Sequence, residues 1–216
     1  MLTALEALQR LREGNERFAS GLRSLESLVS PIRREELVSD QEPFAIILGC
    51  SDSRVPAETI FDQGLGDLFV IRVAGNIVAP SQVGSVEFAV ERFGTRLVVV
   101  LGHTHCGAIR ATLDDVLRTN ACQSKNLLSI VNRIRPHVEQ LFDQNQLSGD
   151  LEQLERLAVR ANVRAATRHL RYEDEVLRPY IEREGLLIVG AEYSLETGIV
   201  DFFDLPQNVH LDDCTA

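Results

Sequence analysis

Three residues that commonly bind metal ions follow two apolar segments of this sequence. Cys50 comes directly after "FAIILG" (44–49), and His103 and Cys106 follow "RLVVVLG" (96–102). Thiolate and imidazole groups suit zinc better than magnesium or calcium. A zinc finger normally holds two short-spaced pairs of ligands, whereas Cys50 lies far from the other two residues along the chain. The spacing therefore predicts a site that a folded sheet assembles, which favours catalysis over local cross-linking.

An aspartate and an arginine lie just after the first cysteine, in "CSDSR" (50–54). Taken singly, Cys50 could be a small buried side chain, Asp52 a turn or cap residue, and Arg54 a solvated charge. Next to a metal, Asp52 is itself a good ligand and would close the site if it bound. Arg54 can grip that carboxylate with two parallel hydrogen bonds and hold it off the metal. Together these residues predict an open metal site, with Asp52 as a fourth ligand only in a closed state.

The segments that position these residues are typical of a parallel sheet. Short, almost continuously apolar runs rich in Val and Ile indicate strands buried on both faces, and a further run after "ETG" indicates an antiparallel edge strand. These runs span 44–49, 68–73, 96–102, 186–195 and 199–205. The carboxyl ends of parallel strands share one edge of a sheet, so Cys50, His103 and Cys106 should converge there. We expect an α/β fold with about four parallel strands, an antiparallel edge strand and flanking helices.

The remaining segments are predicted to be helical. We expect one domain over 1–216, made of an N-terminal helical arm (1–40) and an α/β core (41–216) with C-terminal helices and the edge strand. The arm carries an apolar stripe that suits packing on a neighbouring subunit, with packing on its own domain as the alternative. The residues concerned are Leu2, Leu5, Leu8 and Leu11 in the stripe, Gly21 and Gly94 as helix ends, Pro31 as a helix start, and Pro136 and Pro179 as kinks or breaks.

Composition narrows the class of protein. The 216 residues include 22 basic and 32 acidic side chains, a net charge of −10, which argues against nucleic-acid and anionic-membrane surfaces.

No apolar run approaches the roughly 18 residues of a membrane span, and the N-terminus lacks the apolar core of a signal peptide. Four cysteines without such a signal favour a reducing compartment, so we expect a cytoplasmic protein in which Cys122 and Cys214 are free thiols.

The motifs "CSDSRVPAE" and "GHTHCGAI" together resemble those of the β-class carbonic anhydrases. The similarity extends to "REGNERFASG", "FDQGLGDLFVIRVAGN" and "GAEYSLETGIVDFF". The resemblance implies that Cys50, His103 and Cys106 bind one zinc ion per chain. It also implies that Asp52 and Arg54 control the fourth coordination position.

The same resemblance implies a substrate site and an assembly. Gln41 would donate a hydrogen bond to the substrate, Gly107 would offer its backbone N–H, and Phe69 would line an apolar slot. The family forms homodimers or homotetramers, with active sites near the subunit interface and N-terminal helices reaching over the partner. Some bacterial members have an inhibitory bicarbonate site with a tryptophan three residues before the first ligand; this chain has Ile47 there and no tryptophan.

His105 could rival His103 as a ligand. The spacing of the family favours His103, which leaves His105 as a surface group or a group behind the ligands. The other histidines, His137, His169 and His210, lie outside any motif.

The implied reaction is the reversible hydration of carbon dioxide to bicarbonate and a proton through zinc-bound hydroxide. Two thiolates weaken zinc as a Lewis acid, so Asp52 would help by accepting a hydrogen bond from the hydroxide and orienting it. One alternative keeps the scaffold and hydrolyses carbonyl sulfide or carbon disulfide, since pocket shape decides the substrate. Another alternative is a catalytically silent zinc protein that acts as a sensor or an assembly component.

Overall fold

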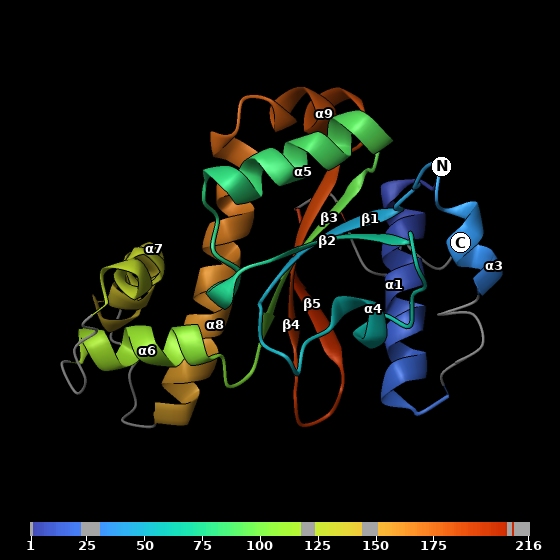
Figure 1. The fold of residues 1–216 in the computed structure, drawn as a ribbon. Helices are drawn as coiled ribbons and strands as arrows, with labels where there is room; N and C mark the ends of the chain where they lie inside the picture. Colours follow the sequence, from blue (N-terminus) through green and yellow to red (C-terminus); the bar gives the residue numbers. More distant parts are fainter. Residues whose placement is uncertain (1, 23–30, 118–123, 144–150, 207–208, 210–216) are drawn as a thin grey trace.

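A computed structural model of the chain describes residues 2–22, 31–117, 124–143, 151–206 and 209. Within these ranges the strands form one sheet with the order β2-β1-β3-β4-β5. The first four strands are parallel, and β5 runs antiparallel to β4 (Figure 1), which confirms the predicted architecture. The strands are β1 (Ala45–Gly49), β2 (Leu68–Arg72), β3 (Leu97–His103), β4 (Leu187–Tyr193) and β5 (Val200–Asp204).

Helices cover both faces of the sheet (Figure 1). One core cluster joins α1 and α4 to the sheet, and a second joins α5, α8 and α9 to its other face. A third cluster joins α6, α7 and α8 beside the ends of β1 and β3. The helices are α1 (Ala4–Ala19), α3 (Pro31–Glu36), α4 (Ala57–Ile60), α5 (Pro80–Phe93), α6 (Gly107–Val116), α7 (Lys125–Asp143), α8 (Leu151–Arg168) and α9 (Leu177–Arg183), with a 3-10 turn η1 (Ala74–Asn76) and a π-helical turn η2 (His169–Glu173).

The N-terminal helix α1 packs on its own sheet. Leu8 and Leu11 are fully buried in the first core cluster, and Leu2 and Leu5 are partly buried against it. The interpretation that this stripe covers a neighbouring subunit was therefore wrong for Leu8 and Leu11, because strands of the same chain already cover them. The helix ends just before Gly21, whose φ of 73° is the left-handed conformation expected of a terminating glycine.

Proline positions and helix ends differ in part from expectation. Gly94 ends α5 in the left-handed conformation, as predicted. Pro136 lies inside α7 and does not divide it. Pro179 lies in the first turn of α9, where a missing N–H has no intrahelical partner in any case. The long helical segment after residue 151 is divided instead by the π-helical turn η2.

Two further expectations concern membranes and thiols. No helix within the described ranges combines the length and the apolar character that crossing a membrane requires. Cys50 and Cys106 are free thiols, whereas Cys122 and Cys214 lie outside the described residues.

Gly14 allows α1 to approach the chain after α4 very closely. A Cβ atom at Gly14 would lie 1.9 Å from the carbonyl oxygen of Phe61, whereas one at Gly84 in α5 would meet nothing within 4 Å. We expect Gly14→Ala to lower the free energy of unfolding by about 1–3 kcal/mol, because α1 must shift. Gly84→Ala, the matched control, should raise it by up to about 1 kcal/mol, because alanine favours the helix. Chemical denaturation measures both, and a Gly14→Ala protein as stable as the parent would contradict the packing described.

Candidate metal centre

Two thiols and one imidazole meet at the carboxyl edge of the sheet. Cys50 directly follows β1, His103 is the last residue of β3, and Cys106 is the N-cap residue of α6. One potential ligand atom from each residue lies within 4.8 Å of the other two, and all three residues are buried. Because β1 and β3 are parallel neighbours, their ends bring together residues that are distant in sequence.

The ring of His103 is oriented by the backbone. Its Nδ1 lies 2.8 Å from the carbonyl oxygen of Thr104, and because a carbonyl can only accept, Nδ1 carries the proton. Nε2 is then an acceptor that faces the cluster, and it is buried without a hydrogen-bond partner. A buried polar atom left in this way costs free energy, which a metal ion bound at Nε2 would recover.

A hydrogen bond joins the two sulfur atoms. The Cys106 thiol donates a hydrogen bond that lowers the pKa of Cys50, and the same contact raises the pKa of Cys106. The backbone N–H of Gly75 also donates to the sulfur of Cys50, at 3.4 Å. A divalent cation would take the place of the proton between the two sulfur atoms and bind both thiolates. The donor atoms therefore fit a zinc ion.

A carboxylate next to the cluster is held by an arginine. The Arg54 side chain donates to both oxygens of Asp52, from Nε at 2.9 Å and from Nη2 at 2.7 Å, and the Arg54 backbone N–H donates at 2.9 Å. These hydrogen bonds hold the pKa of Asp52 well below its usual range. Oδ2 of Asp52 lies 4.0 Å from Nε2 of His103. The carboxylate thus stays ionised beside the cluster, in the two-pronged pairing that the spacing predicted.

A second arginine, not singled out from the sequence, secures the loop that carries this pair. Arg72, the last residue of β2, donates from Nε to the carbonyl oxygen of Cys50 at 2.9 Å and from Nη2 to that of Asp52 at 2.6 Å. The available signal in the sequence was a single charged residue within the otherwise apolar segment "LFVIRV". Its contacts depend on the pairing of β1 with β2, which a linear pattern does not specify.

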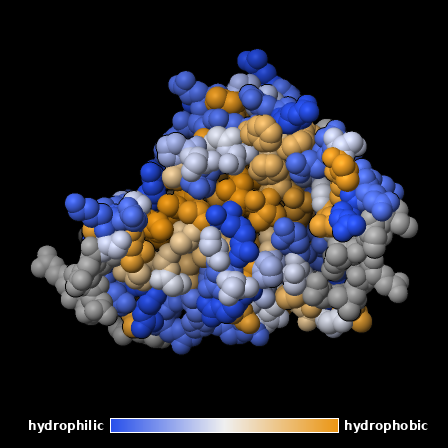
Figure 2. Space-filling model, viewed as in Figure 1, coloured by the Kyte–Doolittle hydropathy of each residue, from blue (hydrophilic) through white to orange (hydrophobic). Residues whose placement is uncertain are grey.

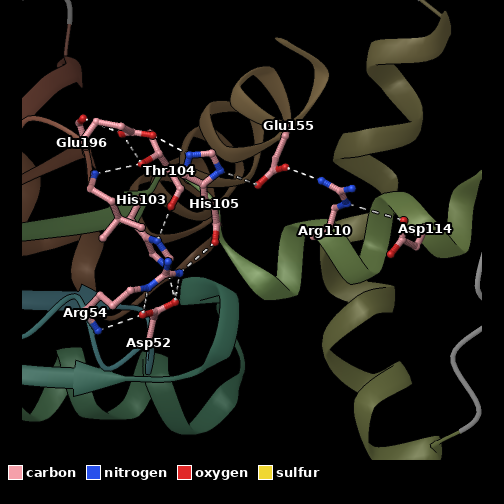
Figure 3. A network of polar contacts seen from close by, with 11 residues as sticks. Asp52, Arg54, His103, Thr104, His105, Arg110, Asp114, Glu155 and Glu196 are labelled. Carbon is pink, nitrogen blue, oxygen red and sulfur yellow. Dashed lines mark hydrogen bonds and ion pairs between the residues drawn. The ribbon is translucent and has the colours of Figure 1, made fainter. Parts of the chain in front are cut away.

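The side chain of His105 is directed towards Glu196 and Glu155 (Figure 3). Its Nε2 lies 2.6 Å from Oε1 of Glu196, and its Nδ1 lies 4.0 Å from Oε1 of Glu155. The structure therefore brings His103, and not His105, to the two thiols. Glu196 is another residue that the sequence reasoning missed, since a glutamate in a turn carries no pattern of its own.

The three residues implied for substrate binding lie in different places. Gly107 follows Cys106 and begins α6, so its N–H belongs to the first turn, where helical N–H groups have no intrahelical partner. Gln41 precedes β1 and is exposed, at the opposite end of that strand from Cys50. Phe69 pairs with Ile46 near the start of β1, so it lies about 10 Å or more along the strands from the cluster. Within one chain, only Gly107 is adjacent to the cluster.

Phe69 belongs to an aromatic group on the outer face of the molecule. Its ring centroid lies 6.2 Å from that of Phe88 and 5.9 Å from that of Phe93. The Phe88 residue is 52% exposed. Apolar side chains gather on the face below α5 and over β2 (Figure 2), next to the open edge of the sheet.

The fold and the cluster together define a class of protein. The chain has a mostly parallel sheet with a buried Cys₂His cluster at its carboxyl edge, beside a carboxylate that arginine restrains, and this is an α/β architecture with a candidate zinc site. The sequence profile of the carbonic anhydrase family matches residues 45–200. The chain belongs to the carbonic anhydrase family, in its β class.

Relatives and solved structures agree with this membership. Carbonic anhydrase 2 of Mycobacterium tuberculosis is 37% identical over 192 residues, which cover 89% of each chain. A carbonic anhydrase of Mycolicibacterium smegmatis is 43% identical over 132 residues, 61% of this chain and 63% of that protein. The structure of the β-carbonic anhydrase CcaA superposes with a TM-score of 0.71 and 28% identity, covering 96% of this chain and 97% of that chain. The β-carbonic anhydrase CafA of Aspergillus fumigatus gives a TM-score of 0.72 at 26% identity, covering 85% of each chain.

Proposed function

We propose that this protein catalyses the reversible hydration of carbon dioxide to bicarbonate and a proton, with one zinc ion per chain held by Cys50, His103 and Cys106. The observation that carries the proposal is the buried Nε2 of His103, which has no hydrogen-bond partner, close to the sulfur atoms of Cys50 and Cys106. The names of the relatives support the same reaction. Zinc in this position would supply the Lewis acidity that lowers the pKa of a coordinated water towards neutrality.

Asp52 and Arg54 would have separate roles in the reaction. The ionised Asp52 can only accept hydrogen bonds. By accepting a hydrogen bond from the attacking oxygen, it would orient a lone pair of that oxygen towards carbon dioxide. Arg54 keeps the carboxylate in this role by occupying both of its oxygens. Gly107, which is exposed at the start of α6, offers its backbone N–H to the developing bicarbonate.

Gln41 and Phe69 require a second copy of the chain if they contact substrate. Both lie away from the cluster in their own chain, and Phe69 lies in the apolar face beside the open edge of β2. A homodimer through that face, alone or within a homotetramer, would bury the exposed Phe88 ring and carry these residues towards the cluster of the partner. We also propose a cytoplasmic location, because free thiol ligands persist in a reducing compartment.

The direct test is metal content with activity. We expect about one zinc per purified chain and carbon dioxide hydration that a zinc chelator abolishes, measured with a pH indicator. Cys106→Ser should lose most of the zinc and of the activity, because a hydroxyl is a poor substitute for thiolate. Cys122→Ser makes the same change outside the proposed ligand set and should keep both. Undiminished zinc in Cys106→Ser would refute the ligand assignment, and faster hydrolysis of carbonyl sulfide than hydration of carbon dioxide would favour the alternative substrate.

The carboxylate restraint gives a second prediction. Arg54→Ala should keep its zinc and lose activity by about 10²–10³-fold, because the freed Asp52 can reach the metal and close the site. Asp52→Asn should lose a similar factor with the site still open, because the attacking oxygen loses its acceptor. Alkaline pH should restore part of the activity in Arg54→Ala only, since hydroxide competes better with the carboxylate there.

Arg17→Ala provides the matched control for these variants. It breaks another arginine–aspartate pair, in which Arg17 of α1 lies 2.6 Å from Asp62. Its activity per folded molecule should equal that of the parent protein. A crystal structure of Arg54→Ala with Asp52 still away from the zinc would rule out the proposed restraint.

The proposed contribution of Gln41 to the active site of a partner chain gives a third prediction. Gln41→Ala should lower kcat/KM, and mixing it with inactive Cys106→Ser chains should restore activity. In such a mixed dimer, one site combines an intact cluster from the first chain with Gln41 from the second. Refolding the two variants together and assaying against each refolded alone measures this effect. Failure of mixed dimers to recover activity, with their formation shown by mass spectrometry, would contradict a contribution of Gln41 across the interface.

A further inference from the structure

Glu196 connects the turn after β4 to the segment between His103 and Cys106. Its Oε2 accepts hydrogen bonds from the hydroxyls of Thr104 and Ser194, each at 2.9 Å, and its Oε1 lies 2.6 Å from Nε2 of His105 (Figure 3). The backbone N–H of Leu195 donates in turn to the hydroxyl of Thr104 at 3.0 Å. One carboxylate therefore holds both residues that follow His103.

The backbone carbonyls of these two residues contact residues of the candidate metal centre. The Thr104 carbonyl accepts from Nδ1 of His103 at 2.8 Å, and the His105 carbonyl accepts from Nη2 of Arg54 at 3.2 Å. The first contact sets which nitrogen of His103 faces the cluster, and the second adds a third acceptor to the guanidinium that restrains Asp52. Both contacts depend on the backbone conformation of Thr104 and His105.

The backbone conformation of His105 must be stabilised by contacts with other residues. His105 has a φ of 55°, in the left-handed region that residues other than glycine rarely adopt. Strain of this kind persists where surrounding contacts determine the backbone, and it is common at functional sites. The His105 side chain lies 2.6 Å from Glu196 and, farther away, 4.0 Å from Glu155.

We propose that Glu196 is a positioning residue for the metal centre: by binding the side chains of Thr104 and His105, it aims their carbonyls at His103 and Arg54. The inference rests on the proposed function, since it assigns Glu196 a part in keeping His103 and Asp52 in their active positions. Glu196 touches neither the cluster nor Asp52, and it acts through the backbone.

Ionisation of Glu196 is compatible with this part. Hydrogen bonds from its own backbone N–H and from Ser194 lower the pKa of Glu196 to about 2. The carboxylate is therefore a full acceptor throughout the pH range in which the protein would work. Its side chain is 53% exposed, so the contribution lies in geometry more than in buried charge.

The first test observes His103 and not activity. In the zinc-loaded protein, we expect the Nδ1 proton of His103 to exchange slowly with solvent, as measured by ¹⁵N NMR of the imidazole. Glu196→Ala should speed this exchange at least tenfold, because the Thr104 carbonyl is released, and Glu196→Gln should have a smaller effect because the amide still accepts one hydrogen bond. Glu173→Ala removes another half-exposed glutamate that pairs with a histidine, His169 at 2.8 Å, and should leave the exchange unchanged. Parent-like exchange in Glu196→Ala overturns the proposal.

The second test asks whether Glu196 acts through Arg54. Glu196→Ala should lower kcat/KM about tenfold in the parent protein and by a clearly smaller factor in the Arg54→Ala background, where only the contact with His103 remains, assayed at alkaline pH with zinc content equal in all variants. Residues that act through one another show such non-additive effects, whereas a loss of general stability would be similar in both backgrounds. Equal losses in the two backgrounds overturn the action through Arg54. If the parent protein does not hydrate carbon dioxide, the proposed function fails, and the exchange measurement still decides the role of Glu196.

Discussion

The parallel pairing of β1 with β3 is the constraint on which the metal centre depends. The ladder sets Gly49 opposite Leu101, so Cys50 emerges from the sheet beside His103 and Cys106. Both strands are buried on both faces, and a slip by one residue would turn every side chain to the opposite face. The apolar residues of these strands thereby determine the separation of the sulfur and nitrogen atoms. The core thereby fixes where the two segments that carry the cluster leave the sheet.

Around this rigid cluster, polar contacts restrain groups that have more than one possible position. Asp52 could bind a metal or leave it, and Arg54 occupies both of its oxygens. His103 could present either nitrogen, and the Thr104 carbonyl selects one. Arg54 and Thr104 are close in sequence to the residues that they restrain. Arg72, on β2, secures the loop between Cys50 and Asp52 from a neighbouring strand. Such layered support is what preorganised sites require, because small displacements of the reacting groups are costly.

Within a single chain, some of the groups implied for substrate binding lie far from the cluster. Gln41 lies at the far end of β1, and Phe69 faces outward in an apolar surface beside the open edge strand β2. Association through that surface would protect the strand edge and the exposed Phe88 ring from solvent. Self-association and substrate binding would then depend on the same face of the molecule.

The sequence by itself determined the strands, their common direction and the convergence of Cys50 with His103 and Cys106, because buried parallel strands have a distinctive apolar pattern and share a carboxyl edge. It also predicted the pairing of Asp52 with Arg54, which is a local contact between near neighbours. The residues alone left His105 as a rival of His103, the family resemblance favoured His103, and the tertiary structure shows the geometry that separates them. The orientation of a side chain after a strand depends on its backbone angles and on a carboxylate, Glu196, from a distant turn.

The packing of α1 likewise required the folded chain. An apolar stripe such as Leu8 and Leu11 records that a helix face is buried, but not which surface buries it. The same limit applies to Arg72, whose partners lie on a neighbouring strand. Periodicity and spacing report local geometry, whereas contacts between distant segments follow from strand order and register, which arise only when the whole sheet forms.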